Sequence, residues 1–91
     1  MKYTVKYTDE AKEDIERLKN NGEISALKKL RKLLFELQEH PETGTGQIER
    51  LKHYSEETWS RRINHKHRLC YRIYGDEVRI ISSYGHYQEK S

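Results

Sequence analysis

The chain has 91 residues, the size of a single domain, so we expect one domain over residues 1–91. Its net charge is +3, 36% of its residues are charged, and its mean hydropathy is -1.16. No apolar run approaches the roughly 20 residues of a membrane-spanning helix, so we expect no contact with a membrane. Seven tyrosines, one tryptophan and regular apolar spacing favour a folded domain over a disordered chain.

The single cysteine, Cys70, rules out an internal disulfide and fits a reducing cytoplasm, which is the compartment we expect. The first residues contain no apolar segment of the secretory type. Charge is unevenly distributed along the chain. Residues 1–47 hold nine basic and nine acidic side chains, whereas residues 48–87 hold eight basic and five acidic ones. The C-terminal half is therefore the basic part of the domain.

Residues 2–7, KYTVKY, alternate between apolar and polar side chains and predict a half-buried strand. Its apolar face consists of Tyr3, Val5 and Tyr7. A helix is predicted next, because Thr8 or Asp9 can cap its N-terminus. The sequence NNG at 20–22 tolerates the left-handed turn that ends helices, so this helix should reach about Asn20.

A second helix is predicted from Glu23 to Glu39, with Pro41 ending it. Its apolar residues are spaced by three or four positions and share one stripe. They are Ile24, Leu27, Leu30, Leu34 and Leu37. The opposite face carries Lys28, Lys29, Lys32 and Glu36. Such a face is typical of a solvated surface, and contact with RNA is the alternative.

The C-terminal half reads as a loop followed by four strands. The loop covers residues 41–47, and the strands are predicted at 48–53, 59–63, 67–74 and 78–87. The element order is therefore β-α-α-β-β-β-β. Two consecutive helices followed by a run of strands predict an α+β fold, in which an antiparallel sheet has two helices packed on one face.

The strand at 67–74 separates apolar from charged side chains by alternation. The face expected to meet the helices consists of Leu69, Tyr71 and Ile73. The face expected to look into solvent or a cleft consists of Arg68, Cys70 and Arg72. Arg62, in the preceding strand, has the parity to join the second face. Arg61 has the parity of the apolar face, so we expect it to snorkel or to sit at an edge.

By default, a polar face of an antiparallel sheet is a solvated surface. Guanidinium groups also bind phosphate through paired hydrogen bonds, and an arginine-lined surface beside Tyr and His resembles a site for single-stranded nucleic acid. Glu49 and His86 would add a carboxylate and an imidazole, which together with two guanidinium groups can cleave RNA without a metal ion. A base takes the proton of the ribose 2′-OH, arginines stabilise the phosphorane, and an acid protonates the departing 5′ oxygen. Histidine suits the acid role because it titrates near neutrality.

Other side chains allow different chemistry. His65 and His67 are two positions apart and could bind a metal ion, but no third ligand has convincing spacing. We therefore expect neither a metal nor a cofactor. Cys70 lacks a clear catalytic partner and is expected to pack in the interior.

Four separated sequence elements resemble one known family in their order and spacing. They are Glu49 followed three residues later by Lys52, WSRRI at 59–63, HRLCY at 67–71, and a His-Tyr pair at 86–87. Together they resemble the YoeB/Txe branch of the RelE/ParE toxin superfamily over residues 41–87. Residues 1–40 match the family in pattern alone, as a strand followed by two amphipathic helices.

The resemblance implies a RelE-like fold and the toxin of a bacterial toxin–antitoxin pair, acting as a ribosome-dependent endoribonuclease that cuts messenger RNA in the A site. The implied catalytic residues are Glu49 as general base, Arg68 as phosphate stabiliser and His86 as general acid. The implied substrate-binding residues are Lys52, Arg62 and Tyr87, of which Tyr87 would orient the RNA. Because Glu49 and Lys52 have opposite strand parity, both reach one cleft only if the strand ends or bulges near Leu51.

The implied partners are an acidic antitoxin protein, the ribosome and messenger RNA. The sequence leaves open whether the free protein is a monomer or a homodimer, and whether Glu49 alone or an Arg–Glu pair serves as the base. Two alternative functions use the same fold. One is a non-enzymatic toxin that inhibits gyrase, like the ParE branch, which lacks this residue set. The other is an inert nucleic-acid-binding module.

Overall fold

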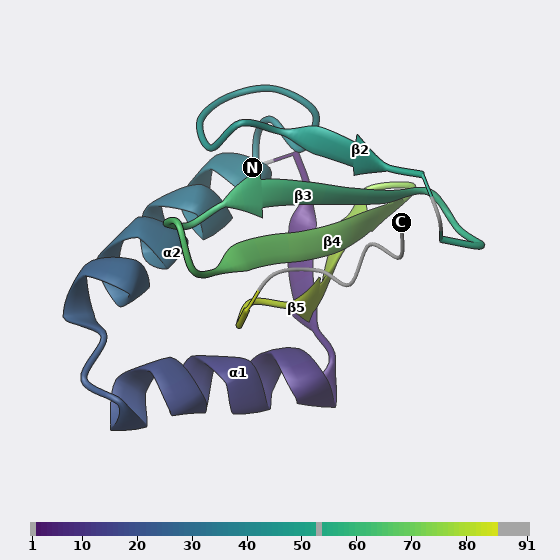
Figure 1. The fold of residues 1–91 in the computed structure, drawn as a ribbon. Coiled ribbons are helices and arrows are strands. Elements are labelled where there is room, and N and C mark those ends of the chain that lie inside the picture. Colours follow the sequence, from purple (N-terminus) through teal and green to yellow (C-terminus); the bar gives the residue numbers. More distant parts are fainter. Residues whose placement is uncertain (1, 53, 86–91) are drawn as a thin grey trace.

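The computed structural model describes residues 2–52 and 54–85, and these form a sheet with two helices (Figure 1). The elements are β1 (Thr4–Tyr7), α1 (Asp9–Asn20), α2 (Ile24–Leu37), β2 (Glu49–Leu51), β3 (Thr58–Arg62), β4 (Arg68–Tyr74) and β5 (Glu77–Ser82). Their order confirms the predicted β-α-α-β-β-β-β arrangement and the α+β class. Neither helix has the length and apolar character that crossing a membrane requires.

The strand order in the sheet is β1-β5-β4-β3-β2. Strands β2 to β5 form the predicted antiparallel meander, but β1 pairs with β5 in parallel. The expectation of an antiparallel sheet is therefore wrong for β1, and the sheet is mixed. Parallel neighbours need a long connection, and here both helices and three strands lie between β1 and β5 in the chain.

The helices begin and end close to their predicted bounds. The Thr8 hydroxyl accepts a hydrogen bond from the Ala11 N–H at 3.1 Å, which confirms Thr8 as the cap of α1. The predicted apolar stripe of α2 is wrong at Ile24, which is exposed. The residues of α2 that face the core are Ala26, Leu30, Leu33 and Leu37. The helix is therefore turned slightly from the predicted orientation, and Leu27 and Leu34 are half-buried at its border.

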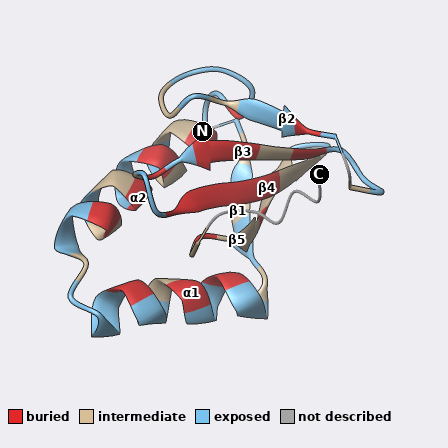
Figure 2. Ribbon diagram, viewed as in Figure 1, coloured by how far each residue is buried: buried red, intermediate tan, exposed pale blue. Residues whose placement is uncertain are grey.

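The core lies between the two helices and one face of the sheet (Figure 2). On the sheet side, Leu69 and Tyr71 of β4 are fully buried, as predicted, and Ile73 is partly buried. From the helix side, α1 contributes Ala11 and Leu18. This core fixes the sheet, so side chains on its other face have a rigid support.

The last strand is shorter than the prediction of 78–87. Strand β5 ends at Ser82, because the next backbone N–H, that of Ser83, donates to the carboxylate of Asp14 on α1 at 2.9 Å. Gly85 then adopts a φ of 74°, a left-handed conformation that glycine tolerates. The chain therefore leaves the sheet after residue 82. The remainder of the predicted strand, residues 86 and 87, lies outside the described residues.

Candidate active site

Two of the predicted catalytic side chains meet on the sheet face opposite the helices. Glu49 stands on the edge strand β2, and Arg68 is the first residue of β4. Their strands are separated by β3, where Ser60 is the register partner of Glu49. Even so, the Arg68 Nη2 atom lies 3.5 Å from the Glu49 Oε1 atom. Folding thus brings together a carboxylate and a guanidinium that are 19 residues apart in the chain.

Arg68 is held in place by contacts beneath this pair. The side chain is 7% exposed, its Nε donates to the Ser60 hydroxyl at 3.1 Å, and its Nη2 donates to the Gln47 carbonyl at 3.2 Å. Gln47 has a φ of 49°, and it is the one non-glycine residue with positive φ in the described part of the chain. A left-handed backbone is uncommon for such a residue and is often found at functional sites.

The loop that carries Gln47 is anchored by Arg61 of β3, which is fully buried. Its Nε donates to the Tyr71 hydroxyl at 3.1 Å, and its Nη1 donates to Glu36 Oε1 at 3.0 Å. Its other hydrogen bonds reach loop carbonyls, those of His40, Thr43 and Thr45. The expectation that Arg61 would snorkel or sit at an edge is therefore wrong. The buried charge is tolerated because a carboxylate, a hydroxyl and three carbonyls surround it.

Glu36 belongs to this buried cluster and not to the solvated face of α2 on which it was predicted. Burial alone would raise the pKa of the Glu36 carboxyl, but hydrogen bonds from the Thr45 backbone N–H and hydroxyl, together with the Arg61 charge, lower it below its ordinary value. The loop passes very close to it, since a Cβ added at Gly44 would lie 2.8 Å from Glu36 Oε1. Lys28 and Lys32 are exposed, as predicted.

The arginine-rich face is less open than predicted. Arg62 and Arg68 are register partners, which confirms that they share a face, and Arg62 is exposed. However, Arg68 and Cys70 are buried, and Arg72 is partly buried with its Nε donating to the Thr58 hydroxyl at 2.9 Å. Burial raises the pKa of the Cys70 thiol, which agrees with its predicted packing role.

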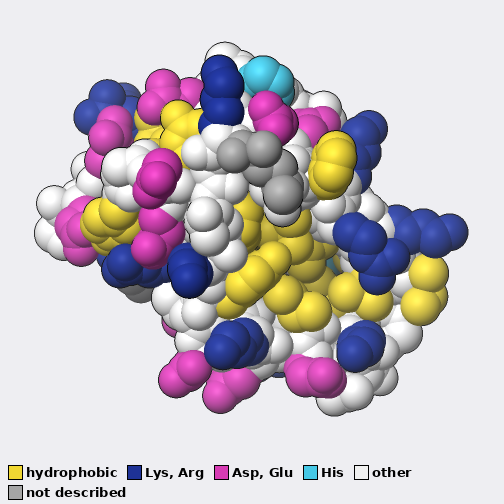
Figure 3. All heavy atoms as spheres, turned by 180° about the vertical axis from the view of Figure 1, so that it is seen from behind, with side chains coloured by type: hydrophobic (Ala, Val, Ile, Leu, Met, Phe, Trp, Pro, Cys, Tyr) yellow, Lys and Arg dark blue, Asp and Glu magenta, His cyan; other side chains and the backbone are white. Residues whose placement is uncertain are grey.

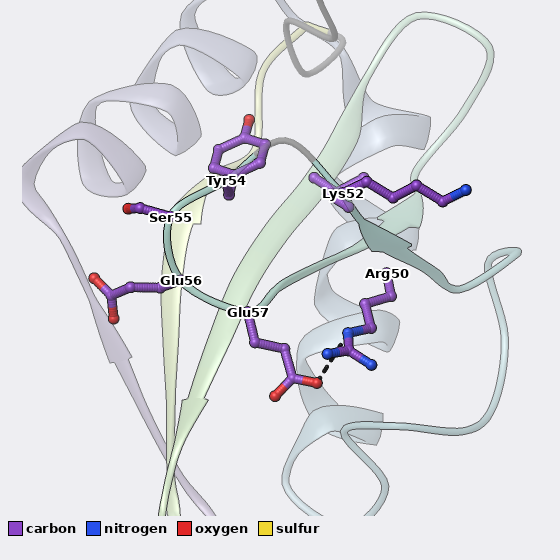
Figure 4. A pocket seen from close by; sticks show the side chains of 7 residues that line it. Arg50, Lys52, Tyr54, Ser55, Glu56 and Glu57 are labelled. Atoms are coloured by element: carbon purple, nitrogen blue, oxygen red, sulfur yellow. Dashed lines mark ion pairs between the residues drawn. The ribbon is translucent and has the colours of Figure 1, made fainter.

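Lys52 lies just past the end of β2, which terminates at Leu51 as the parity argument required. It lines an open hollow of about 500 Å³ formed by the end of β2 and the connection that leads to β3, together with the side chains shown in Figure 4. Within this hollow Arg50 points toward Glu57, and their Nε and Oε2 atoms are 3.0 Å apart. Neither Glu49 nor Arg68 is among the residues that line this hollow.

The two histidines of the possible metal pair have different surroundings. His65 is exposed, whereas His67 is fully buried with its Nε2 2.8 Å from Glu23 Oε1. In the described ranges 2–52 and 54–85, no three His, Cys, Asp or Glu side chains are arranged to hold a metal ion.

The predicted residues His86 and Tyr87 lie outside the described residues. The last described residue, Gly85, does lie close to the site. Its carbonyl accepts a hydrogen bond from the Arg68 backbone N–H at 2.9 Å. Gly85, which precedes His86 in the sequence, is therefore bound to the backbone of Arg68.

Three residues of the site were missed from the sequence. The alternation of side chains placed Ser60 on the same face as Arg62. It did not indicate that the Ser60 hydroxyl would accept a hydrogen bond from Arg68. Gly44 and Gly46 indicated a loop with an unusual backbone. They did not indicate that the Gln47 carbonyl would accept a hydrogen bond from Arg68. His67 was considered as a metal ligand alone, although it directly precedes Arg68, the predicted phosphate stabiliser.

Comparison with known proteins identifies the family of the chain. The family model described as "YoeB-like toxin of bacterial type II toxin-antitoxin system" matches residues 7–87. Toxin YoeB of Synechocystis is 42% identical over 62 residues, which is 68% of this chain and 72% of that protein. Toxin YoeB of Escherichia coli K12 is 38% identical over 61 residues, or 67% of this chain and 73% of that protein.

Solved structures show the same fold. The YoeB dimer from Staphylococcus aureus matches with a TM-score of 0.82 and 31% identity, covering 96% of this chain and 100% of that one. The YoeB/ParE toxin from Agrobacterium tumefaciens matches with a TM-score of 0.82 and 28% identity, covering 92% and 99%. Since the family model spans most of the chain and the fold agrees over nearly all of it, this chain belongs to the YoeB-like toxins of bacterial type II toxin–antitoxin systems.

Proposed function

We propose that this toxin is a ribosome-dependent endoribonuclease that cleaves messenger RNA without a metal ion or cofactor. The observation that carries the proposal is the 3.5 Å approach of the Arg68 guanidinium to the Glu49 carboxylate. Glu49 is half exposed while Arg68 is supported from below by Ser60 and Gln47. An RNA phosphate arriving at this face would meet a fixed guanidinium beside an accessible carboxylate.

The proposed reaction is an internal transfer at one phosphodiester. Glu49 removes the proton from the ribose 2′-OH, and the 2′ oxygen attacks the adjacent phosphorus. Arg68 stabilises the negative charge that develops on the phosphorane oxygens. His86 gives a proton to the 5′ oxygen as the P–O5′ bond breaks. The products are a 2′,3′-cyclic phosphate upstream and a 5′-hydroxyl downstream.

The neighbouring basic residues would bind the rest of the RNA. Arg62 is exposed and is the register partner of Arg68, so it can contact a phosphate next to the reacting one. Lys52 is exposed at the rim of the hollow beside β2 and can contact the strand further along. Tyr87 is assigned the orienting role that the family resemblance implies. Ribosome binding by this basic domain should strengthen as salt is lowered.

An acidic antitoxin is the proposed protein partner, and the site of action is the cytoplasm, where ribosomes are found. Hydrophobic side chains gather on the surface seen in Figure 3. Phe35 and Ile24 of α2 are exposed, and a shallow groove of about 90 Å³ runs between the helices, lined by Ile15, Leu27, Leu30, Arg31 and Leu34. Exposed apolar side chains on a charged domain favour a partner that covers them. A similar toxin from Staphylococcus aureus forms a YoeB–YefM complex.

The experiment that tests the function maps cleavage ends on a translated messenger, with and without ribosomes. We expect cuts only with ribosomes, a 2′,3′-cyclic phosphate upstream and a 5′-hydroxyl downstream. A messenger carrying a 2′-O-methyl group at the cut position should remain intact, because the nucleophile is blocked. Ends with a 5′-phosphate would contradict the mechanism, and growth arrest without any cleavage would favour gyrase inhibition.

Matched variants make the test specific to the site. Glu49→Gln should abolish most cleavage, whereas Glu57→Gln should leave it unchanged. These two glutamates have almost equal exposure, 52% and 53%, and each pairs with an arginine. His86→Ala should abolish cleavage, and His40→Ala, at an exposed histidine, is its control. Equal losses in a variant and its control would contradict the assigned roles.

A further inference from the structure

His67 immediately precedes β4 and is fully buried, and both of its ring nitrogens are engaged. Its Nδ1 atom accepts a hydrogen bond from the Gly85 backbone N–H at 2.8 Å, and its Nε2 atom lies 2.8 Å from Glu23 Oε1. A backbone N–H can only donate, so Nδ1 must carry the lone pair and Nε2 the hydrogen. His67 therefore donates to Glu23, and this hydrogen bond lowers the pKa of the Glu23 carboxyl.

Gly85 is held at both of its backbone polar groups by two consecutive residues. Its N–H binds the ring of His67, and its carbonyl binds the backbone N–H of Arg68 at 2.9 Å. The peptide on each side of the Gly85 Cα is therefore fixed relative to the start of β4. Gly85 has a left-handed φ of 74°, a conformation that glycine adopts without the steric cost of a side chain.

The residue before Gly85 is held as well. The Tyr84 ring packs against the His67 ring with 4.4 Å between centroids, and the Cζ atom of the Arg17 guanidinium lies 4.3 Å from the centroid of the Tyr84 ring. The Tyr84 hydroxyl accepts a hydrogen bond from the Asn21 side chain at 3.1 Å. The segment 84–85 thus contacts both the C-terminal end of α1 and the beginning of β4.

We propose that His67 is a positioning residue for His86, which follows Gly85 directly in the chain. The proposal rests on the proposed function, in which His86 is the general acid. His67 touches no substrate in this scheme and acts through the Gly85 peptide. A general acid must be held to within a fraction of an ångström, and a displacement of about 1 Å can cost about 100-fold in rate.

The position of His67 in the chain argues for more than a stabilising role. A buried histidine needs a partner for each nitrogen, and many backbone groups could supply one. Here Nδ1 binds the residue next to the proposed acid, and Arg68, the proposed phosphate stabiliser, is the residue next to His67. His67 and Arg68 therefore hold Gly85, the residue before the proposed acid, against the strand that carries the proposed phosphate stabiliser.

Two substitutions separate the contacts of His67. In His67→Asn, an amide oxygen can take the place of Nδ1 and accept from Gly85, while the contact with Glu23 is lost. In His67→Gln, the longer amide can reach Glu23, but no acceptor remains at the Nδ1 position. We expect His67→Gln to lower kcat about 10- to 100-fold with little change in KM, because the phosphate-binding arginines are intact. We expect His67→Asn to retain most of kcat.

A double-mutant cycle tests whether the effect passes through His86. Once His86→Ala has removed the acid, adding His67→Gln should cause no further loss of rate. Hydrogen exchange measured without RNA should show faster exchange of the Gly85 amide in His67→Gln, and near-normal exchange in His67→Asn. Equal kcat losses in the two variants, or an undiminished effect in the His86→Ala background, would overturn the positioning role.

The exchange measurement also separates this proposal from the proposed function. If the Gly85 amide is equally protected in wild type and in His67→Gln, then His67 does not hold the segment and the proposal fails. A wild-type protein that leaves RNA intact would instead overturn the proposed function. The catalytic role of His67 would fall with it, while the exchange data would still decide whether His67 holds Gly85.

Discussion

Two of the arginine–glutamate pairs, one on each face of the sheet, have the same chemistry and opposite surroundings. Arg61 and Glu36 meet at 3.0 Å on the helix side, and both are enclosed, at 0% and 22% exposure. Arg68 and Glu49 meet at 3.5 Å on the other face, where Arg68 is buried but Glu49 is half exposed. The two pairs therefore differ in the exposure of the carboxylate, which is enclosed in the pair that anchors a loop and open to solvent in the pair for which we propose a catalytic role.

Strand register explains how such similar residues are separated. Arg62 pairs with Arg68 across β3 and β4, so these two share a face, while the adjacent Arg61 pairs with Leu69 and points to the core. A shift of one residue along a strand moves a side chain to the opposite face. The two faces are nevertheless linked, because Arg61 anchors the loop whose Gln47 carbonyl supports Arg68.

The largest effect on stability should come from breaking the enclosed pair. In Arg61→Met, the Glu36 carboxylate and several loop carbonyls lose their buried partner, so we expect a loss of about 3–5 kcal/mol in the free energy of unfolding. Urea unfolding followed by circular dichroism would measure it. The neighbouring exposed residue supplies the control, since Arg62→Met should change stability by less than about 0.5 kcal/mol. Equal losses in the two variants would contradict the assignment of Arg61 as an anchor.

The half-exposed pair should respond mainly in activity. Arg68→Lys keeps the charge but loses the planar fork that binds a phosphate at two points, so we expect cleavage to slow about 100- to 1,000-fold. The rate of messenger cleavage on ribosomes measures this effect. Arg72→Lys is the matched control, because Arg72 lies on the same strand and also binds a β3 hydroxyl. A comparable loss in Arg72→Lys would mean that general positive charge, and not Arg68, is required.

Local sequence patterns predicted most of the fold because they are set by local chemistry. The alternation at 67–74, the Thr8 cap and the breaks at 20–22 and Pro41 each depend on nearby residues. The parallel pairing of β1 with β5 was missed. It depends on how the two helices and three strands that lie between them in the chain pack together, and no local pattern reports that. The end of β5 was missed for a similar reason, since Asp14 on α1 takes up the Ser83 N–H.

The candidate site was predicted less completely, because its supports are formed by distant residues. Parity placed Arg68 and Arg62 on one face, and spacing with the family resemblance singled out Glu49. Arg61 has the parity of the apolar face, but it was expected to snorkel or to sit at an edge, because its buried partners, Glu36 and the loop carbonyls, are distant in the chain. The approach of Gly85 to His67 likewise joins residues 18 apart through their tertiary placement.

The enclosed pair should also depend on pH. The folded pKa of Glu36 lies below its ordinary value of 4.5, so its stabilising contribution is present above that pH and is lost as the pH falls through the folded pKa. We expect Glu36→Gln to cost about 1.5–3 kcal/mol of unfolding free energy at pH 7, and progressively less as the pH falls below about 4.5. Urea unfolding of wild type and variant at pH 7 and pH 3 would measure this. A difference that is the same at both pH values would contradict a charged Glu36.

The smallest predicted effect comes from removing the hydroxyls that bind Arg68 and Arg72. It tests whether these hydroxyls act on stability alone or also on the rate of cleavage. Ser60 and Thr58 are buried on β3, and their hydroxyls accept from the Nε atoms of Arg68 and Arg72 respectively. Ser60→Ala should cost about 0.5–1.5 kcal/mol of stability, the range of one hydrogen bond. Thr58→Val should cost somewhat more, because the Thr58 hydroxyl also donates to the Glu56 carbonyl at 2.9 Å. Ser60→Ala should also slow cleavage about tenfold, because Arg68 loses part of its orientation, whereas Thr58→Val should leave the rate unchanged. Urea unfolding and messenger cleavage, both measured on each variant, test this prediction. If both variants slow cleavage in proportion to their lost stability, the orientation of Arg68 makes no separate contribution to the rate.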